Sequence, residues 1–215
     1  MIAVVTVLLC ANAYAQPSAL SVDIEALGDR PAELSTPERP YVEVLRDGLA
    51  GILASFTNAR SCERATARSL LFADVSASDS ATQRLTQNGA RLYNERVHAE
   101  MCGAQFMPNY YVLVTPGQPT WLLEGTPGRT RASPLLQGDV QPQVLRVARA
   151  LAQCAEPNVI GVAHTIATPA DASGAWSETW IVSACGRRVD IPLNFTPAQQ
   201  GGIDCAIKGD QARVQ

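Results

Sequence analysis

The C-terminal residues 156–215 carry the pattern that most constrains the fold. Apolar runs are separated there by turn residues, and between 189 and 196 apolar and polar residues alternate without a break. A period of two residues is typical of a strand with one buried and one solvated face. Successive short runs with tight turns between them predict an antiparallel meander. The expected strands are residues 159–167, 177–184, 189–195 and 203–207.

The residues just before this meander predict a helix and a hairpin. Residues 140–155 place apolar side chains and Cys154 along one helical face, which indicates packing against the sheet. Residues 110–114 and 120–123 are rich in aromatic and β-branched residues and predict two short strands. Between them and the helix, residues 125–138 are rich in glycine and proline and predict a loop.

The first half of the chain shows the spacing of helices. Apolar residues recur every three or four positions from Tyr41 to Phe56, where Gly48 and Gly51 either weaken the helix or allow close packing. Further helices are expected over 63–72 and 80–103, the latter opened by a capping box of Ser80 and Gln83.

These patterns divide the chain into a lead segment or flexible arm (16–35), a helical region (36–108) and an α+β region (109–215) that ends in the meander. The predicted class is α+β, with N-terminal helices followed by a C-terminal antiparallel sheet packed against a helix and stabilised by disulfides.

Residues 1–15 resemble a signal peptide. An apolar run over 2–11 leads to Ala13-Tyr14-Ala15, which has the small-x-small form of a cleavage site. The run is too short to span a bilayer, so we expect no integral membrane span after cleavage, with a membrane anchor as the alternative. Bulky Leu9 argues against lipidation at Cys10. The sequence predicts a periplasmic or secreted protein.

Export makes the cysteines candidates for disulfides. Of the six cysteines, Cys10 lies in the signal, and no pair has the C-x-x-C spacing of zinc or redox sites. One bridge is expected in each half of the chain, among Cys62 and Cys102 and among Cys154 and Cys185. Cys205 is then unpaired, either as a free thiol or in a disulfide with an envelope or secreted partner protein.

Charge and composition exclude several classes of partner. The net charge is −3, 47% of residues are hydrophobic and 17% are charged, which is the composition of a folded globular chain. Because there is no basic cluster, we expect neither nucleic acid nor an anionic membrane surface as partner.

The two histidines are the weak candidates for catalysis. Glu95 and His98, with Glu100 nearby, have a Glu-x-x-His spacing on a predicted helix, but a di-iron site needs a second copy of that motif. The alternative is a solvated helix face with ion pairs, so we expect no metal and no cofactor. His164 lies between Val162 and Ile166 on a predicted strand and is expected to share their face.

His164 is a candidate base for a serine or for Cys205, although no Gly-x-Ser-x-Gly elbow is present. The favoured interpretation is a half-buried, hydrogen-bonded structural histidine. Arg129 and Arg131 among glycines form a candidate anion clamp, without the spacing of a P-loop. The favoured interpretation there is a solvated connection.

A motif in the meander carries a family resemblance. Trp180-x-Val182-x-x-Cys185-Gly186, then Phe195-x-Pro197 and Gly201-Gly202, resembles the C-terminal end of a family of uncharacterised exported proteins of Gram-negative bacteria. The resemblance extends less clearly to residues 125–139. It implies export but no activity, and Cys205 departs from the aromatic residue expected near that position.

Two classes of function fit the sequence. The favoured class is a non-catalytic exported protein, in the envelope or secreted, that binds a partner or supports an assembly. The alternative is a small secreted hydrolase or transferase that uses His164 or His98 with a serine or Cys205.

Overall fold

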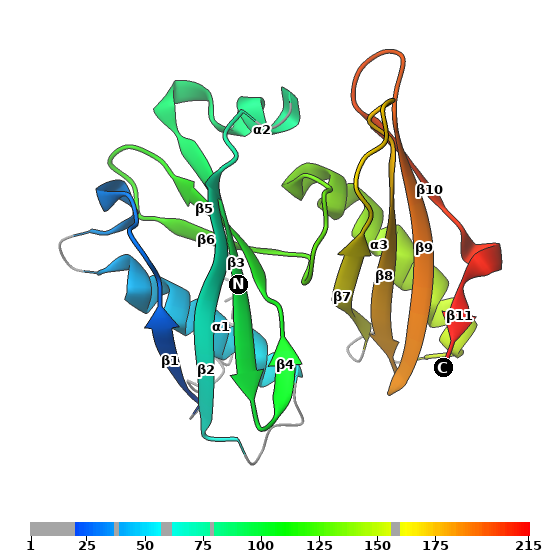
Figure 1. Cartoon of the computed structure of the whole chain (residues 1–215), viewed down its shortest axis with the longest axis horizontal. Helices are drawn as coiled ribbons and strands as arrows, with labels where there is room; N and C mark the ends of the chain where they lie inside the picture. Colours follow the sequence, from blue (N-terminus) through cyan, green and yellow to red (C-terminus); the bar gives the residue numbers. More distant parts are fainter. Residues whose placement is uncertain (1–19, 37–38, 57–61, 78–79, 156–159) are drawn as a thin grey trace, which may run out of the picture.

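A computed structural model describes residues 20–36, 39–56, 62–77, 80–155 and 160–215 of the chain. The predicted signal peptide, including Cys10, lies outside these residues. The described chain forms two units side by side, each made of a sheet and one long helix (Figure 1). The class is therefore α+β, as expected, with more sheet and fewer helices than the sequence predicts.

The N-terminal unit contains sheet A and the helix α1. Its elements are β1 (Ser21–Ala26), a 3-10 turn (Ala32–Leu34), α1 (Tyr41–Phe56), β2 (Arg64–Asp74), α2 (Ser80–Leu85), a 3-10 turn (Gln87–Gly89), β3 (Arg91–Met101), β4 (Ala104–Phe106), β5 (Asn109–Val114) and β6 (Trp121–Gly125). The strand order is β1-β2-β3-β5-β6, and β4 pairs with the end of β3. Only β1 and β2 are parallel; the other pairs in the described part of sheet A are antiparallel.

The C-terminal unit contains sheet B and the helix α3. Its elements are α3 (Pro134–Ala152), β7 (Ile160–Ala167), β8 (Trp176–Ala184), β9 (Arg187–Pro197), β10 (Ile203–Ile207), a 3-10 turn (Gly209–Gln211) and β11 (Arg213–Val214). The order is β10-β9-β8-β7, with β11 paired to β9. All these pairs are antiparallel, so the predicted meander is confirmed.

The helix α1 covers one face of sheet A, as its apolar spacing indicates. Its residues Tyr41, Leu45 and Leu49 are buried in one core together with residues of β2, β3 and β5. Gly48 permits a close approach to β6, because a Cβ atom there would lie 2.3 Å from Leu122 Cδ2. Close packing is therefore the role of this helical glycine.

The helices predicted over 63–72 and 80–103 are wrong. Residues 64–72 lie in β2, and the capping-box segment forms only the short α2 before the chain enters β3. In β3, Val97, Ala99 and Met101 alternate into the core. This period of two was hidden because residues 92–95 are buried on both faces of the strand. The region 36–108 thus contributes most of sheet A.

Residues 20–35 are an integral part of the N-terminal unit. The sequence predicts a lead segment or arm over 16–35, whereas β1 pairs in parallel with β2 and Leu34 is buried. A buried ion pair holds the connection after β1: Arg30 Nη2 lies 2.9 Å from Glu95 Oε1. The guanidinium of Arg30 also lies over the ring of Phe72, 4.3 Å from its centroid.

The second core lies between α3 and sheet B. Val189, Ile191, Leu193 and Phe195, the alternating residues of β9, are each 0% exposed and pack with the inner face of α3. The helix begins earlier than predicted, at Pro134, because Ser133 caps it by accepting a hydrogen bond from the Leu136 N–H.

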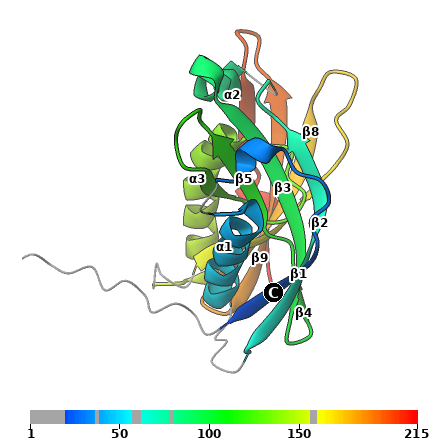
Figure 2. The same ribbon diagram turned by 90° about the vertical axis from the view of Figure 1, so that its left-hand side faces the viewer.

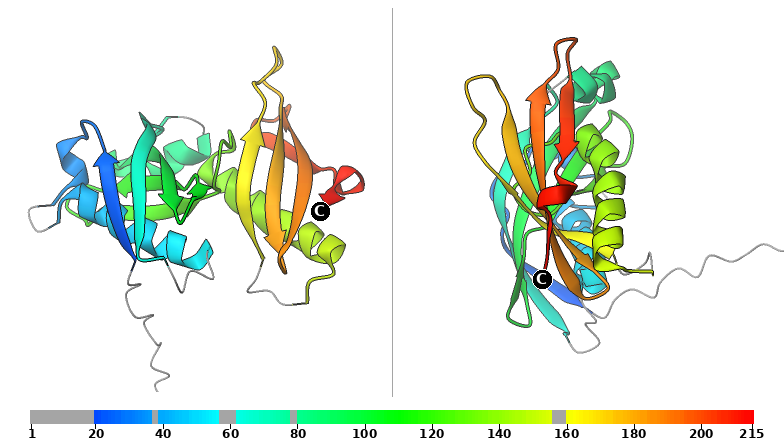
Figure 3. Two further views of the ribbon diagram at one scale, coloured as in Figure 1. Left: turned by 60° about the horizontal axis from the view of Figure 1, so that its bottom comes forward. Right: turned by 90° about the vertical axis from the view of Figure 1, so that its right-hand side faces the viewer.

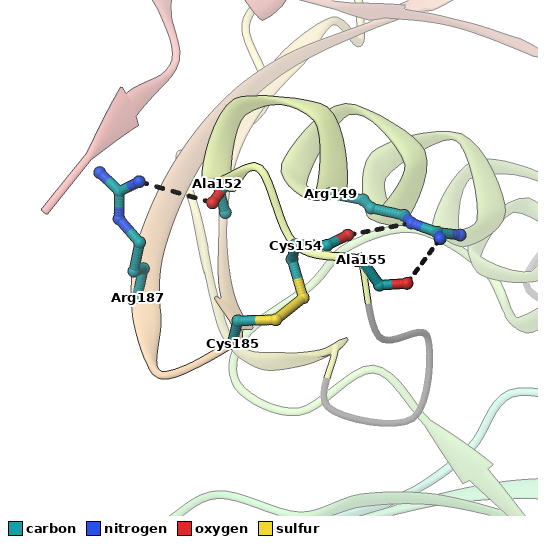
Figure 4. Close-up of a disulfide and its surroundings, with 6 residues drawn as sticks. All are labelled: Arg149, Ala152, Cys154, Ala155, Cys185 and Arg187. Atoms are coloured by element: carbon teal, nitrogen blue, oxygen red, sulfur yellow. Dashed lines mark hydrogen bonds between the residues drawn. A yellow bond between two sulfur atoms is a disulfide. The ribbon is translucent and has the colours of Figure 1, made fainter.

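Both predicted disulfides are present. Cys62–Cys102 joins the start of β2 to the β3–β4 turn, and Cys154–Cys185 joins the end of α3 to the β8–β9 turn. Around the second bridge, Arg149 donates to the carbonyls of Cys154 and Ala155, and Arg187 donates to that of Ala152 (Figure 4). Basic side chains thus satisfy carbonyls at the end of α3.

The two long helices, α1 and α3, lie on the same side of the molecule, and the sheets lie on the other side (Figures 2 and 3). Each sheet therefore has one face covered by its helix and one face turned away from it. Within the described residues, no helix combines the length and the apolar character that crossing a bilayer requires.

Candidate functional site

The two units are joined by residues 125–133, which we call the junction segment. Residues 125–128 are buried, contrary to the expectation of a solvated connection. The Gly128 N–H donates to the Met107 carbonyl, and the Arg129 N–H donates to the Thr165 carbonyl of β7. Gly128 has a φ of +99°, and a Cβ there would lie 2.4 Å from the Thr165 backbone nitrogen. Only glycine fits this contact.

A buried polar network fixes the junction segment to both units. Asn94 Nδ2 donates to Asn109 Oδ1 at 2.7 Å, and Asn109 Nδ2 donates to the Thr126 carbonyl at 3.3 Å. From the first turn of α3, Gln137 Nε2 donates to the Tyr111 hydroxyl, and Gln137 Oε1 accepts from the Thr126 N–H, both at 2.8 Å. These bonds connect β3, β5 and α3 through groups that water does not reach.

Glu178 fixes the other end of the segment. Its carboxylate is 2% exposed and accepts from the indole N–H groups of Trp176 and Trp180, each at 2.8 Å. It also accepts from the Thr130 hydroxyl at 3.2 Å and the Arg131 N–H at 2.8 Å. Trp176 in turn stacks on Phe195, with ring centroids 4.7 Å apart. The indole of Trp176 is therefore held rigidly.

A pocket of about 610 Å³ lies between the two units, and Trp176 and Arg131 are among its lining residues. Its lining comes from α2, β3 and β5 on one side, from the first residues of α3, and from Trp176 and the β9–β10 turn on the other side. Figure 1 shows α2 on one side of the start of α3 and the β9–β10 turn on the other side. The pocket thus depends on the placement of both units.

The pocket combines an excess of positive charge with an apolar wall. Arg84, Arg131 and Asp139 line it, and none of the three has an ion-pair partner among the described residues. Trp176 and Ile203 supply apolar surface. The first turn of α3 adds the partial positive charge of a helix N-terminus. The candidate arginines Arg129 and Arg131 are separated here, because only Arg131 lines the pocket.

The candidate catalytic residues of sheet B lie far apart. His164 is on β7 and Cys205 on β10, the two strands that end the order β10-β9-β8-β7, so about 14 Å of sheet separates their strands. Burial raises the pKa of the Cys205 thiol to about 11, and the charge of Glu178 adds to this. The thiol of Cys205 is therefore protonated at neutral pH.

His164 was predicted to share the face of Val162 and Ile166, but it shares only that of Ile166. A bulge between Val162 and His164 shifts the register, so Val162 is buried while His164 pairs with Ile181 on the face away from α3. Burial lowers the pKa of His164, and the positive charges of Arg129 and Arg188 lower it further.

Glu95 and His98 do not form one cluster, because they lie on a strand. Their odd spacing places them on opposite faces of β3. Glu95 faces the core and binds Arg30, whereas His98 lies in a shallow polar pocket of about 340 Å³ with Arg68 and Glu100. Among the described residues, no group of three or more metal-ligating side chains is placed to hold a metal ion.

Apart from Arg131, the residues that line the pocket or hold its wall in place were not among the sequence-based candidates. Trp176, Glu178 and Trp180 occupy every second position of a strand, which is typical of ordinary core alternation. Neither a family model, nor a curated protein, nor a solved structure matches this chain.

Proposed function

We propose that this chain is an exported, non-catalytic binding protein that takes a small anionic ligand with an apolar part in the pocket between its units. The observation that carries the proposal is the pocket itself, a concave site lined from both units with a few convergent polar groups. Two disulfides, one within each unit, support an oxidising compartment.

The class of ligand follows from the lining. Two guanidiniums against one carboxylate favour an anion, and guanidinium forks suit carboxylate or phosphate oxygens. The indole of Trp176 and the side chains of Leu135 and Ile203 offer apolar contact beside these charges. Because Glu178 already holds Trp176 and the Arg131 backbone, the site is organised before a ligand arrives.

The alternative hydrolase or transferase requires a base in contact with its nucleophile. In the described residues, Cys205 and His164 lie on opposite edges of sheet B, and neither His98 nor His164 has a hydrogen bond to a serine. The geometry therefore supports binding better than catalysis. A protein partner in the envelope or medium, including one joined through Cys205, stays a prediction.

The test is ligand titration followed by tryptophan fluorescence and thermal unfolding. The probes are hexanoate and benzoate, compared with the neutral hexanol and benzamide. We expect the carboxylates to change the fluorescence of Trp176 and raise the Tm, and the neutral probes to do neither. Arg131→Gln should weaken carboxylate binding about tenfold.

Arg146→Gln is the matched control, because Arg146 is an exposed arginine of α3 outside the pocket lining. It removes the same charge and should leave the titration unchanged. The proposal is wrong if neither carboxylate binds at concentrations up to about 10 mM, or if Arg131→Gln and Arg146→Gln weaken binding equally.

A further inference from the structure

Arg96 is a half-buried cation without an ion-pair partner. It lies on β3, on the face of sheet A away from α1, and its Nε atom is buried with no hydrogen bond. No carboxylate forms an ion pair with it in the described part of the chain. A buried guanidinium N–H without an acceptor is costly, and native proteins satisfy such groups with protein atoms, water or an ion.

The segment that carries Arg129 lies between the strands that carry Arg96 and His164. Three hydrogen bonds connect the neighbouring segments: Val97 N–H to Pro108 O, Gly128 N–H to Met107 O, and Arg129 N–H to Thr165 O. They run from the residue after Arg96, through the β4–β5 connection and the junction segment, to the residue after His164. We call Arg96, Arg129 and His164 the seam cluster, because it lies where the two sheets meet.

Arg129 acts electrostatically on both Arg96 and His164. The charge of Arg129 lowers the pKa of both Arg96 and His164, adding to the effect of burial in each case. Arg188 also faces His164, but it is engaged by Asp190 through two hydrogen bonds of 2.7 and 3.0 Å. The seam cluster therefore combines two guanidinium charges with an imidazole whose protonated form is disfavoured, and no carboxylate is paired with these groups among the described residues.

We propose that the seam cluster binds the phosphate group of a phosphate ester or of inorganic phosphate. Two guanidiniums and an imidazole supply several N–H donors, which suits an oxyanion with three or more acceptor oxygens. A bound anion provides the counter-charge that these groups lack and an acceptor for Arg96 Nε.

Apolar side chains beside the cluster favour an ester. Leu71 pairs in register with Arg96 and is 41% exposed, and Ile166 follows His164 on the same face of β7 and is 52% exposed. An alkyl chain attached to the phosphate would cover these side chains. The site is distinct from the pocket, since Arg131 lines the pocket whereas Arg96, Arg129 and His164 do not.

The test is isothermal titration calorimetry at low ionic strength with inorganic phosphate and with hexyl phosphate. We expect both to bind, and hexyl phosphate to bind more tightly because of Leu71 and Ile166. Arg96→Gln and Arg129→Gln should each weaken both ligands about tenfold or more. Arg146→Gln, a charge change on exposed α3 surface, should leave both unchanged. Equal affinity for the two ligands would assign the site to free phosphate.

A stability measurement separates binding from a structural role. Arg96→Met should raise the Tm in phosphate-free buffer, because it removes an unpaired buried charge, and should abolish the rise in Tm that phosphate gives the native chain. The proposal fails if neither ligand binds at up to about 10 mM. It also fails if Arg131→Gln abolishes phosphate binding while Arg96→Gln and Arg129→Gln do not, since the pocket would then be the phosphate site.

Discussion

At the scale of single residues, Gly128 is the position where the fold tolerates least change. Gly128→Ala puts a Cβ against the backbone of Thr165 at a φ of +99°, so strain and overlap add. We expect a loss of about 2–5 kcal/mol in the free energy of unfolding. Urea denaturation measures it.

Gly117→Ala is the control for this prediction. Gly117 has a φ of +72°, but a Cβ atom added there would have nothing within 4 Å of it. The substitution should cost only the strain of a left-handed residue, about 1–2 kcal/mol. Equal losses for the two variants would mean that the contact between the junction segment and β7 is not tight.

Cys205 gives a prediction about pH. Its thiol pKa is raised in the fold to about 11, so the folded state keeps its proton while the unfolded state loses it above a pH near the ordinary thiol value of 9.0. This contribution to stability is therefore present below pH 9 and is lost as the pH rises toward 11. At pH 8, alkylation of native Cys205 should be at least about tenfold slower than in the unfolded chain.

Alkylation by iodoacetamide, followed by mass spectrometry with and without urea, measures these rates. Reaction at equal rates in both states would show that Cys205 is an ordinary exposed thiol. In that case, a disulfide with a partner protein through Cys205 gains support.

At the scale of elements, the buried pair of Arg30 and Glu95 holds the β1–α1 connection on sheet A. Glu95 is 0% exposed and accepts from Arg30, Ser69 and Tyr41. Glu95→Gln leaves the nearly buried guanidinium without a counter-charge and should cost about 3 kcal/mol of unfolding free energy. Asp47→Asn, which breaks the exposed pair with Arg39, should cost less than about 1 kcal/mol. Similar losses in urea denaturation would contradict this difference.

The sequence predicted the elements whose burial is one-sided. The β9 strand and α1 each have one apolar face, so their periods of two and of about 3.6 are visible in the chain. In β3, both faces are buried near Tyr93 and Asn94, one against α1 and the other against the junction, so the period disappears. No local pattern distinguishes such a strand from a helix, because long-range packing decides it.

The candidate site was predicted only in fragments. Arg129 and Arg131 were named as candidate anion ligands, but whether they act together depends on the junction segment, which connects the two sheets. Arg96 gave no signal, since its missing counter-ion is a property of the assembled fold. The motif residues Trp180 and Phe195 lie instead in the core of the C-terminal unit.

At the scale of the whole molecule, the disulfides do not join the two units. Each bridge closes a loop within one unit. The units are therefore coupled by the junction segment and by the polar network around Gln137. If the pocket is the binding site, this coupling fixes the position of its two walls relative to each other, because the lining comes from both units.

Gln137→Leu tests the coupling. It leaves the Thr126 N–H without its acceptor and the Tyr111 hydroxyl without its donor, at a cost of about 2–4 kcal/mol. Because this loss falls at the contact between the units, we expect the variant to unfold in two transitions and the native chain to unfold in one. Guanidinium denaturation followed by circular dichroism reports both units, whereas tryptophan fluorescence reports mainly the C-terminal unit, which contains Trp176 and buried Trp180, while Trp121 of the N-terminal unit is exposed.

Gln143→Leu supplies the comparison, since Gln143 lies on the same helix but is exposed and its side chain donates to the Asp139 carbonyl of that helix. It should leave the two signals coincident. If the signals also coincide for Gln137→Leu, with a midpoint close to that of the native chain, the units are coupled mainly by the backbone contacts of Gly128 and Arg129. The relative position of the pocket walls would then depend on the junction segment alone. In that case, we expect Gly128→Ala to be the variant in which the two units unfold in separate transitions.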